Sequence, residues 1–182
     1  GDEHAEFHHG VYQNPPPNVH GRHVLIVDFS YKRQVLMEMA AAARSICILD
    51  HHKTAAEDLT GFAMPQPVKD WWYFGVPSDT WETASPTALF DLERSGAGLT
   101  WDFLYPGAPR PALIDHIEDR DLWRFRLPHT REIQAAVFSY PYDFEVWDRL
   151  MRMSIADLAK EGVAIERKHH KDITELLAQT RR

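Results

Sequence analysis

Two short segments of the chain end in residues that suit metal-dependent phosphate chemistry. Asp28 closes one apolar run, and Asp50, His51 and His52 close another. Carboxylate oxygens and imidazole nitrogens are ligands that Mn²⁺ and similar divalent ions accept. A divalent ion can activate water and neutralise the charge that develops on a phosphoryl group. These four residues therefore predict a metal site that acts on phosphoesters.

The elements around these residues indicate how they are positioned. Residues 23–29 and 45–50 are short apolar runs typical of strands covered on both faces. Residues 31–44 between them are rich in helix formers and have one apolar side. This order predicts a βαβ crossover with parallel strands. Because ligands bind outside the carboxyl ends of such strands, we expect Asp28 and Asp50 to face one crevice.

The residues after the histidine pair predict the start of a helix. Thr54 and Glu57 have capping-box spacing, which places His51 and His52 on a tight loop before a helix N-terminus. A lone aspartate at a strand end is usually a turn or cap residue, and adjacent histidines alone carry little weight. Their combination with a second strand-terminal aspartate and a helix start favours a functional site.

The same segments resemble a known family. VDFS, which ends at Ser30, and LDHHKTA, residues 49–55, are similar to the second and third motifs of the DHH phosphoesterase superfamily. Its members include single-strand exonucleases, oligoribonucleases, cyclic-dinucleotide phosphodiesterases and manganese pyrophosphatases. The resemblance extends more loosely over most of the chain. It implies phosphoryl chemistry without defining one substrate.

The resemblance also implies a role for each matching residue. Asp28 matches an aspartate that bridges two metal ions, and His51 matches a metal-binding histidine. His52 would contact the substrate phosphate, while Asp50 would orient His51 and fix its tautomer. Asp119 matches a further metal ligand downstream. The expected cofactor is Mn²⁺ or Mg²⁺, with two ions in a complete site.

Two features of the family pattern remain open in this chain. Asp121 is an alternative to Asp119, because both lie in the segment IEDRDLW. The family's first motif, a turn rich in His and Asp, is not found upstream of Asp28. We also expect no second, substrate-clamping domain within these residues. We therefore expect a central part of a DHH protein, and an alternative function as a catalytically impaired binding or scaffold module.

Composition limits the classes of partner and location. The chain has 182 residues, is 44% hydrophobic and carries a net charge of −7, which disfavours an extensive surface for duplex nucleic acid. No stretch approaches the roughly 18 apolar residues of a membrane span, and residues 1–20 lack the apolar centre of a secretory signal. The single cysteine, Cys47, fits a reducing compartment. We expect a cytoplasmic protein that acts on a nucleotide or another small phosphoester.

The remaining elements complete the expected α/β fold, a largely parallel sheet flanked by helices with a helical C-terminal third. Residues 86–92 predict another strand, and residues 95–98 begin a helix whose small residues suit either phosphate binding or tight packing. We expect a catalytic domain over residues 1–153 and a helical linker over residues 154–182. Helices are predicted in four stretches of the C-terminal part, residues 111–123, 131–138, 144–153 and 154–180.

Overall fold

The structure is a computed structural model that describes residues 5–65 and 86–180. The chain forms two compact units, Gly1–Ala108 and Pro109–Arg182. The described part of the first unit contains a parallel sheet with helices on both faces, and that of the second is helical. The predicted α/β fold with a helical C-terminal third is therefore confirmed.

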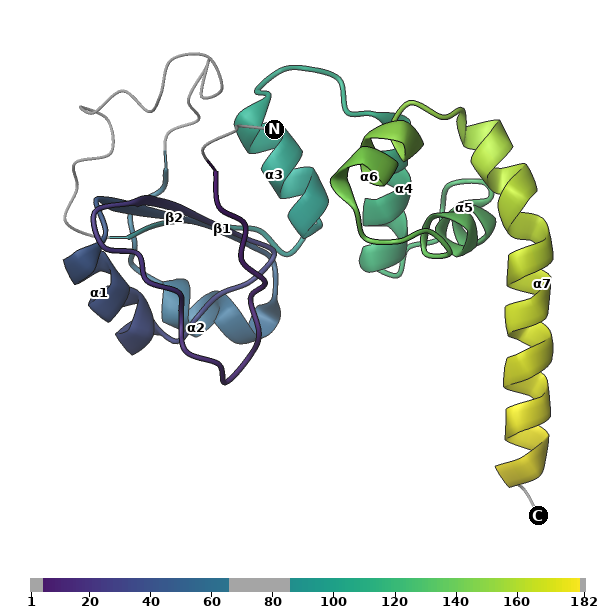
Figure 1. Cartoon of the computed structure of the whole chain (residues 1–182), viewed down its shortest axis with the longest axis horizontal. Coiled ribbons are helices and arrows are strands. Elements are labelled where there is room, and N and C mark those ends of the chain that lie inside the picture. Colours follow the sequence, from purple (N-terminus) through teal and green to yellow (C-terminus); the bar gives the residue numbers. More distant parts are fainter. Residues whose placement is uncertain (1–4, 66–85, 181–182) are drawn as a thin grey trace. The chain divides into compact units, whose positions relative to one another are not determined.

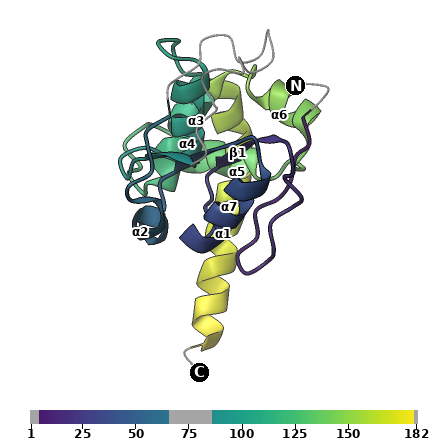
Figure 2. The same ribbon diagram turned by 90° about the vertical axis from the view of Figure 1, so that its left-hand side faces the viewer.

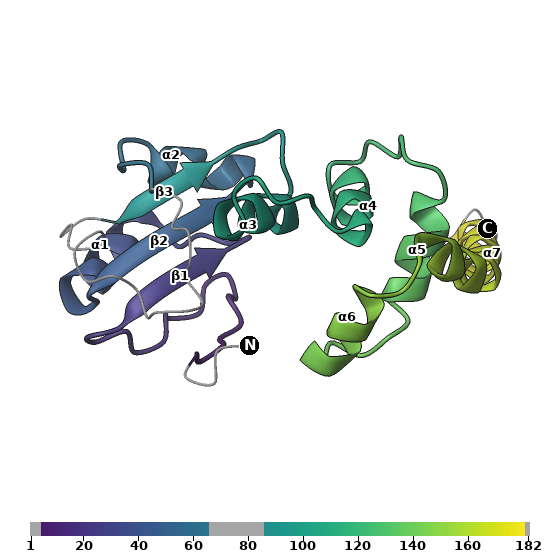
Figure 3. The same ribbon diagram turned by 90° about the horizontal axis from the view of Figure 1, so that it is seen from above.

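The sheet of the first unit has the parallel strands that the sequence predicted. Strands β1 (His23–Val27), β2 (Ser45–Asp50) and β3 (Thr87–Phe90) lie in the order β1-β2-β3. All three run in the same direction, with β2 in the centre (Figure 3). Val27 pairs with Leu49, so β1 and β2 end side by side. This register brings the residues that follow the two strands to one edge of the sheet.

Helices cover both faces of this sheet. Helices α1 (Arg33–Ala42) and α2 (Ala56–Leu59) pack on one face, and α3 (Gly96–Leu104) packs on the other (Figure 1). Alternate strand residues divide between two cores, as the period of a strand requires. The first core contains Ile26, Leu36, Met39, Ile46, Ile48 and Leu59, and the second contains Cys47, Leu49 and Phe103. Burial raises the pKa of the Cys47 thiol to about 12, which keeps this thiol protonated.

The segment after the histidine pair differs from the prediction. It forms a short 3₁₀ turn, η1 (Lys53–Ala55), followed by the four-residue helix α2. Neither element has a side-chain hydrogen bond at its N-cap, so the predicted capping box of Thr54 and Glu57 is wrong. The spacing matched the motif, but the 3₁₀ turn shifts the start of the α-helix beyond Thr54.

The second unit consists of helices in its described part. They are α4 (Ala112–Asp121), α5 (Thr130–Val137), α6 (Phe144–Leu150) and α7 (Ile155–Thr180), close to the four predicted stretches. Ser154 caps α7 by accepting a hydrogen bond from the backbone N–H of Asp157 at 3.1 Å. The N-terminal half of α7 packs against α5, while its C-terminal half extends beyond the other helices of the unit (Figure 2).

The division of the chain into compact units falls between Ala108 and Pro109. The domain boundary expected after residue 153 stays a prediction. Helix α7 shares its core with α4, α5 and α6, through Leu158 and Ala159.

Among the helices that the structure describes, none has the length and apolar character needed to cross a membrane.

Candidate metal centre

Asp28 directly follows β1 at the edge where the parallel strands end. Its backbone N–H donates a hydrogen bond to the carbonyl of Leu49 at 2.9 Å, which extends the ladder between β1 and β2 by one residue. Its φ is 54°, in the left-handed region, where aspartate is better tolerated than most residues. The side chain is 57% exposed, so its carboxylate is open to a ligand.

Asp50 ends β2 and holds the loop that carries the two histidines. It is fully buried, and its Oδ1 accepts hydrogen bonds from the backbone N–H groups of His51 at 2.7 Å and His52 at 3.1 Å. These contacts are local side-chain to backbone bonds, which fix a turn without help from the rest of the fold. Asp50 thus sets the direction of the chain as it leaves the sheet.

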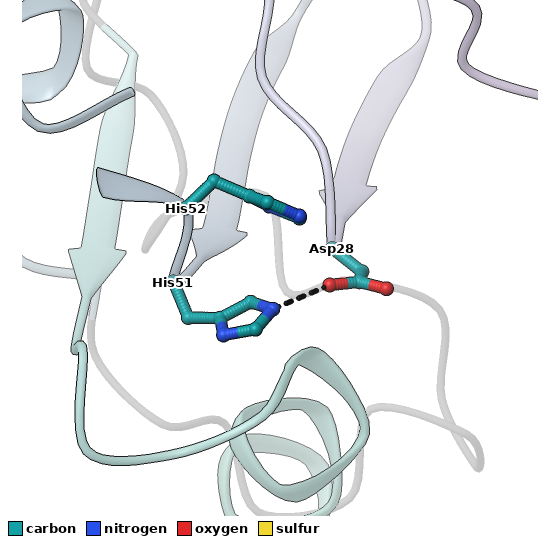
Figure 4. A group of neighbouring side chains, drawn as sticks. All are labelled: Asp28, His51 and His52. Carbon is teal, nitrogen blue, oxygen red and sulfur yellow. Dashed lines mark ion pairs between the residues drawn. The ribbon is translucent and has the colours of Figure 1, made fainter. Parts of the chain in front are cut away.

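The two imidazoles lie beside the carboxylate of Asp28. Nε2 of His51 is 3.0 Å from Oδ1 of Asp28, and the His51 side chain is 11% exposed. The rings of His51 and His52 have centroids 4.6 Å apart, and both project toward Asp28 (Figure 4). Asp28, His51 and His52 each offer one ligand atom, and all three atoms lie within 4.8 Å of one another. This separation suits ligands of one ion.

The His52 ring is held by Asp50, a contact that differs from the expected one. The resemblance implies that Asp50 orients the ring of His51, but Oδ1 of Asp50 lies 2.8 Å from Nδ1 of His52. Oδ1 of Asp50 accepts from the backbone N–H groups of both histidines. The turn that these bonds form brings the His52 side chain, two residues later, back to the same oxygen. A proton on Nδ1 of His52 would leave Nε2 as the free nitrogen, the arrangement that carboxylates impose on metal-binding histidines.

The donor set fits a divalent cation. One carboxylate and two imidazoles match the ligands of Mn²⁺, Zn²⁺ and related ions. In addition, Oδ2 of the fully buried Asp50 has no hydrogen-bond partner within the described part of the chain. A buried carboxylate oxygen without a partner is costly, and a nearby cation would offset that cost. The residues that are present therefore favour a positively charged occupant.

Gly96 is a part of this site that the sequence analysis did not identify. It is the first residue of α3, and Ser95 caps the helix by accepting a hydrogen bond from the N–H of Gly98 at 3.0 Å. A Cβ placed on Gly96 would lie 2.3 Å from Oδ1 of Asp28 and 2.5 Å from its Cβ. The small residues of this segment had signalled close packing or phosphate binding, and the observed close neighbour is the Asp28 side chain.

Asp119, the expected downstream ligand, lies on α4 in the second unit and is 5% exposed. Its Oδ1 accepts from the N–H of Arg126 at 2.8 Å, and its Oδ2 accepts from the N–H of Leu127 at 3.1 Å. The Thr130 hydroxyl also donates to Oδ2, at 2.6 Å. Within its own unit Asp119 thus ties the loop after α4 to the start of α5. Its role as a metal ligand, like that of the alternative Asp121, stays a prediction.

The Asp119 contacts predict an acid-sensitive stability. Burial raises the pKa of Asp119, but its hydrogen bonds outweigh burial, and the pKa lies below the ordinary value of an aspartate. The ionised carboxylate therefore stabilises the fold fully above the unfolded pKa of about 3.9, and this stabilisation is lost as the pH falls through the lowered folded pKa. We expect Asp119→Asn to lower the free energy of unfolding by about 2–3 kcal/mol at neutral pH and by less in acid.

Denaturant unfolding followed by circular dichroism, at neutral and acidic pH, measures this difference. Asp121→Asn is the matched control, because Asp121 lies on the same helix and carries the same charge. An equal loss of stability in both variants, or a difference that persists unchanged in acid, would contradict the structural role given to Asp119.

A viral protein is similar in sequence to this chain. The chain is 32% identical over 141 residues to uncharacterized protein R106 of Acanthamoeba polyphaga mimivirus. The match covers 78% of this chain and 28% of the viral protein, so the chain spans under a third of that relative's length. No family model matches the chain. No solved structure matches it either. The function must therefore be argued from the site itself.

Proposed function

We propose that this chain forms part of a divalent-metal-dependent phosphoester hydrolase of the DHH type, with Mn²⁺ or Mg²⁺ as cofactor. The observation that carries the proposal is the convergence of the Asp28 carboxylate with the imidazoles of His51 and His52, within 4.8 Å, at the ends of adjacent parallel strands. Ligands bind at this edge in open α/β sheets. The proposed substrate is a nucleotide, a short oligonucleotide or another small phosphoester.

Asp28, His51 and His52 would hold the cation. When bound, it would supply Lewis-acid activation of water and neutralise charge on the phosphoryl oxygens. Nε2 of His51 lies 3.0 Å from Oδ1 of Asp28, so an imidazole nitrogen and a carboxylate oxygen would face the same ion.

Asp50 would position the two histidine ligands. It holds the His52 ring through Nδ1, so that Nε2 would be the nitrogen that contacts the metal ion or the substrate phosphate. Because Asp50 also accepts from the backbone of both histidines, it positions the two imidazoles as one unit. Positioning of this kind reduces the entropy lost when the site binds its ligands.

A catalytically impaired metal-binding module is the second candidate. The group of potential ligands found among the described residues contains three side chains, enough for one ion, whereas two ions are expected in a complete site of the DHH type. A chain with one ion would bind metal and phosphate without rapid turnover. The two candidates share the site and differ in activity. The cytoplasmic location stays a prediction under both.

Hydrolysis of bis(p-nitrophenyl) phosphate and p-nitrophenyl phosphate, with and without Mn²⁺, tests the proposal. We expect turnover that requires Mn²⁺ and falls by more than about 100-fold in His51→Ala, because even the loss of an outer-shell partner of a metal ligand costs about 10–100-fold. His170→Ala is the control, since His170 is an exposed residue of α7. Mn²⁺ binding without turnover of either ester would select the second candidate.

A further inference from the structure

A turn near the N-terminus places Tyr12 against Phe29, the residue that follows Asp28. The backbone N–H of Asn14 donates to the carbonyl of Val11 at 3.1 Å and closes the turn. Gln13 has a φ of 71°, the left-handed conformation that such a turn uses at its third position. Tyr12 is therefore presented by a defined backbone conformation.

The turn is attached to the residue that follows Asp28. The rings of Tyr12 and Phe29 have centroids 4.9 Å apart at an angle of 46°. Two residues before Tyr12, a Cβ on Gly10 would lie 2.7 Å from Cγ of Phe29, so the backbone itself rests on this ring. Phe29 is buried in the core under α1. The position of Tyr12 is thus fixed through Phe29 to the strand end that carries Asp28.

Tyr12 also lines a cavity of about 810 Å³. The cavity wall includes Phe29 and Tyr31, just after Asp28, and Thr54, two residues after His52. Its size lies within the roughly 300–1,000 Å³ of small-molecule sites. A group bound there would lie beside both segments that supply the metal ligands.

The Tyr12 hydroxyl is suited to donate a hydrogen bond to an anion in this place. Burial, followed by the negative charges of Asp50 and Asp28, raises the pKa of Tyr12 above its ordinary value. The hydroxyl consequently keeps its proton at neutral pH. It makes no hydrogen bond to any residue that the structure describes, and the side chain is largely exposed. Its donor is therefore available to a ligand.

We propose that Tyr12 is a substrate-binding residue whose hydroxyl donates a hydrogen bond to a phosphoryl oxygen of the ester, while the adjacent cavity receives the organic group. The proposal rests on the proposed function, since it takes the phosphoryl group to lie at Asp28, His51 and His52. It adds a contact from the N-terminal turn, outside the sheet and outside the motifs that suggested the site. A charge-assisted hydrogen bond of this type contributes about tenfold or more to binding.

Calorimetric titration of inorganic phosphate into the Mn²⁺-loaded protein tests this role without requiring turnover. Tyr12→Phe removes the hydroxyl and keeps the ring on Phe29, and we expect it to weaken phosphate binding about tenfold. Mn²⁺ affinity is expected to stay unchanged. Tyr142→Phe is the control, because Tyr142 is an exposed tyrosine of the second unit whose ring stacks on Trp147. Phosphate binding in this control is expected to equal that of the unmodified protein.

The outcomes separate this inference from the proposed function. Phosphate binding that is unchanged in Tyr12→Phe, equally weak in Tyr142→Phe, or absent from the Mn²⁺-loaded protein would overturn the role of Tyr12. Phosphate binding that depends on Tyr12 in a protein that hydrolyses neither ester would support the inference and reject the hydrolase. A protein that binds no Mn²⁺ would reject both.

Discussion

Gly96→Ala is expected to weaken Mn²⁺ binding by at least about tenfold, although it adds only one methyl group. A Cβ at this position would lie 2.3–2.5 Å from three atoms of the Asp28 side chain, including its own Cβ. Asp28 cannot yield easily, because its backbone is fixed in the left-handed region and bonded to Leu49. The added methyl therefore moves the carboxylate away from His51, and a displaced outer-shell contact already costs about 10–100-fold in metal affinity.

A second glycine provides the control for this experiment. Gly162 lies within α7, and a Cβ there would lie 1.7 Å from the carbonyl oxygen of Glu132. Gly162→Ala is thus expected to lower the melting temperature by disturbing the packing of α7 on α5, and to leave Mn²⁺ affinity unchanged. Alanine favours a helix over glycine by about 1 kcal/mol. Helix propensity would therefore explain neither the lower Mn²⁺ affinity of Gly96→Ala nor the lower melting temperature of Gly162→Ala. Gly96→Ala that binds Mn²⁺ like the unmodified protein would contradict the close contact with Asp28.

The elements that position the site could be predicted because their signals are local. The apolar runs before Asp28 and after Arg44 predicted β1 and β2, and the helix formers between them predicted α1. Parallel pairing followed from the crossover, and it brought Asp28 to the edge where Asp50 ends β2. The close approach of Asp28 to the histidines could therefore be predicted from the sequence.

The contacts made by these residues could not be predicted, because they depend on packing between segments distant in the chain. The small residues around Gly96 predicted a close approach, but they did not identify Asp28 as the neighbour. Tyr12 lies in a segment without periodicity, and no sequence signal related it to Phe29. For Asp119, residue type alone could not separate a metal ligand from an acceptor of three hydrogen bonds.

The resemblance to the DHH phosphoesterases and the geometry of the site support the proposal in different ways. The resemblance rests on the motif letters around Asp28 and His51, and it implies a role for each residue. The geometry brings the ligand atoms within 4.8 Å and assigns Asp50 to His52 instead of His51. In both cases the site is centred on the same pair of strand ends. The central claim is therefore that Asp28 and His51 bind a divalent ion.

Calorimetric titration of Mn²⁺ into the purified chain, beside Asp28→Ala and His51→Ala, tests that claim most directly. We expect stoichiometric binding to the unmodified protein and a loss of more than about 100-fold in Mn²⁺ affinity in each variant, because each removes a direct ligand. His170→Ala, which alters an exposed histidine of α7, is expected to bind as the unmodified protein does. Folded protein that binds no Mn²⁺, or variants that bind it unchanged, would contradict the account.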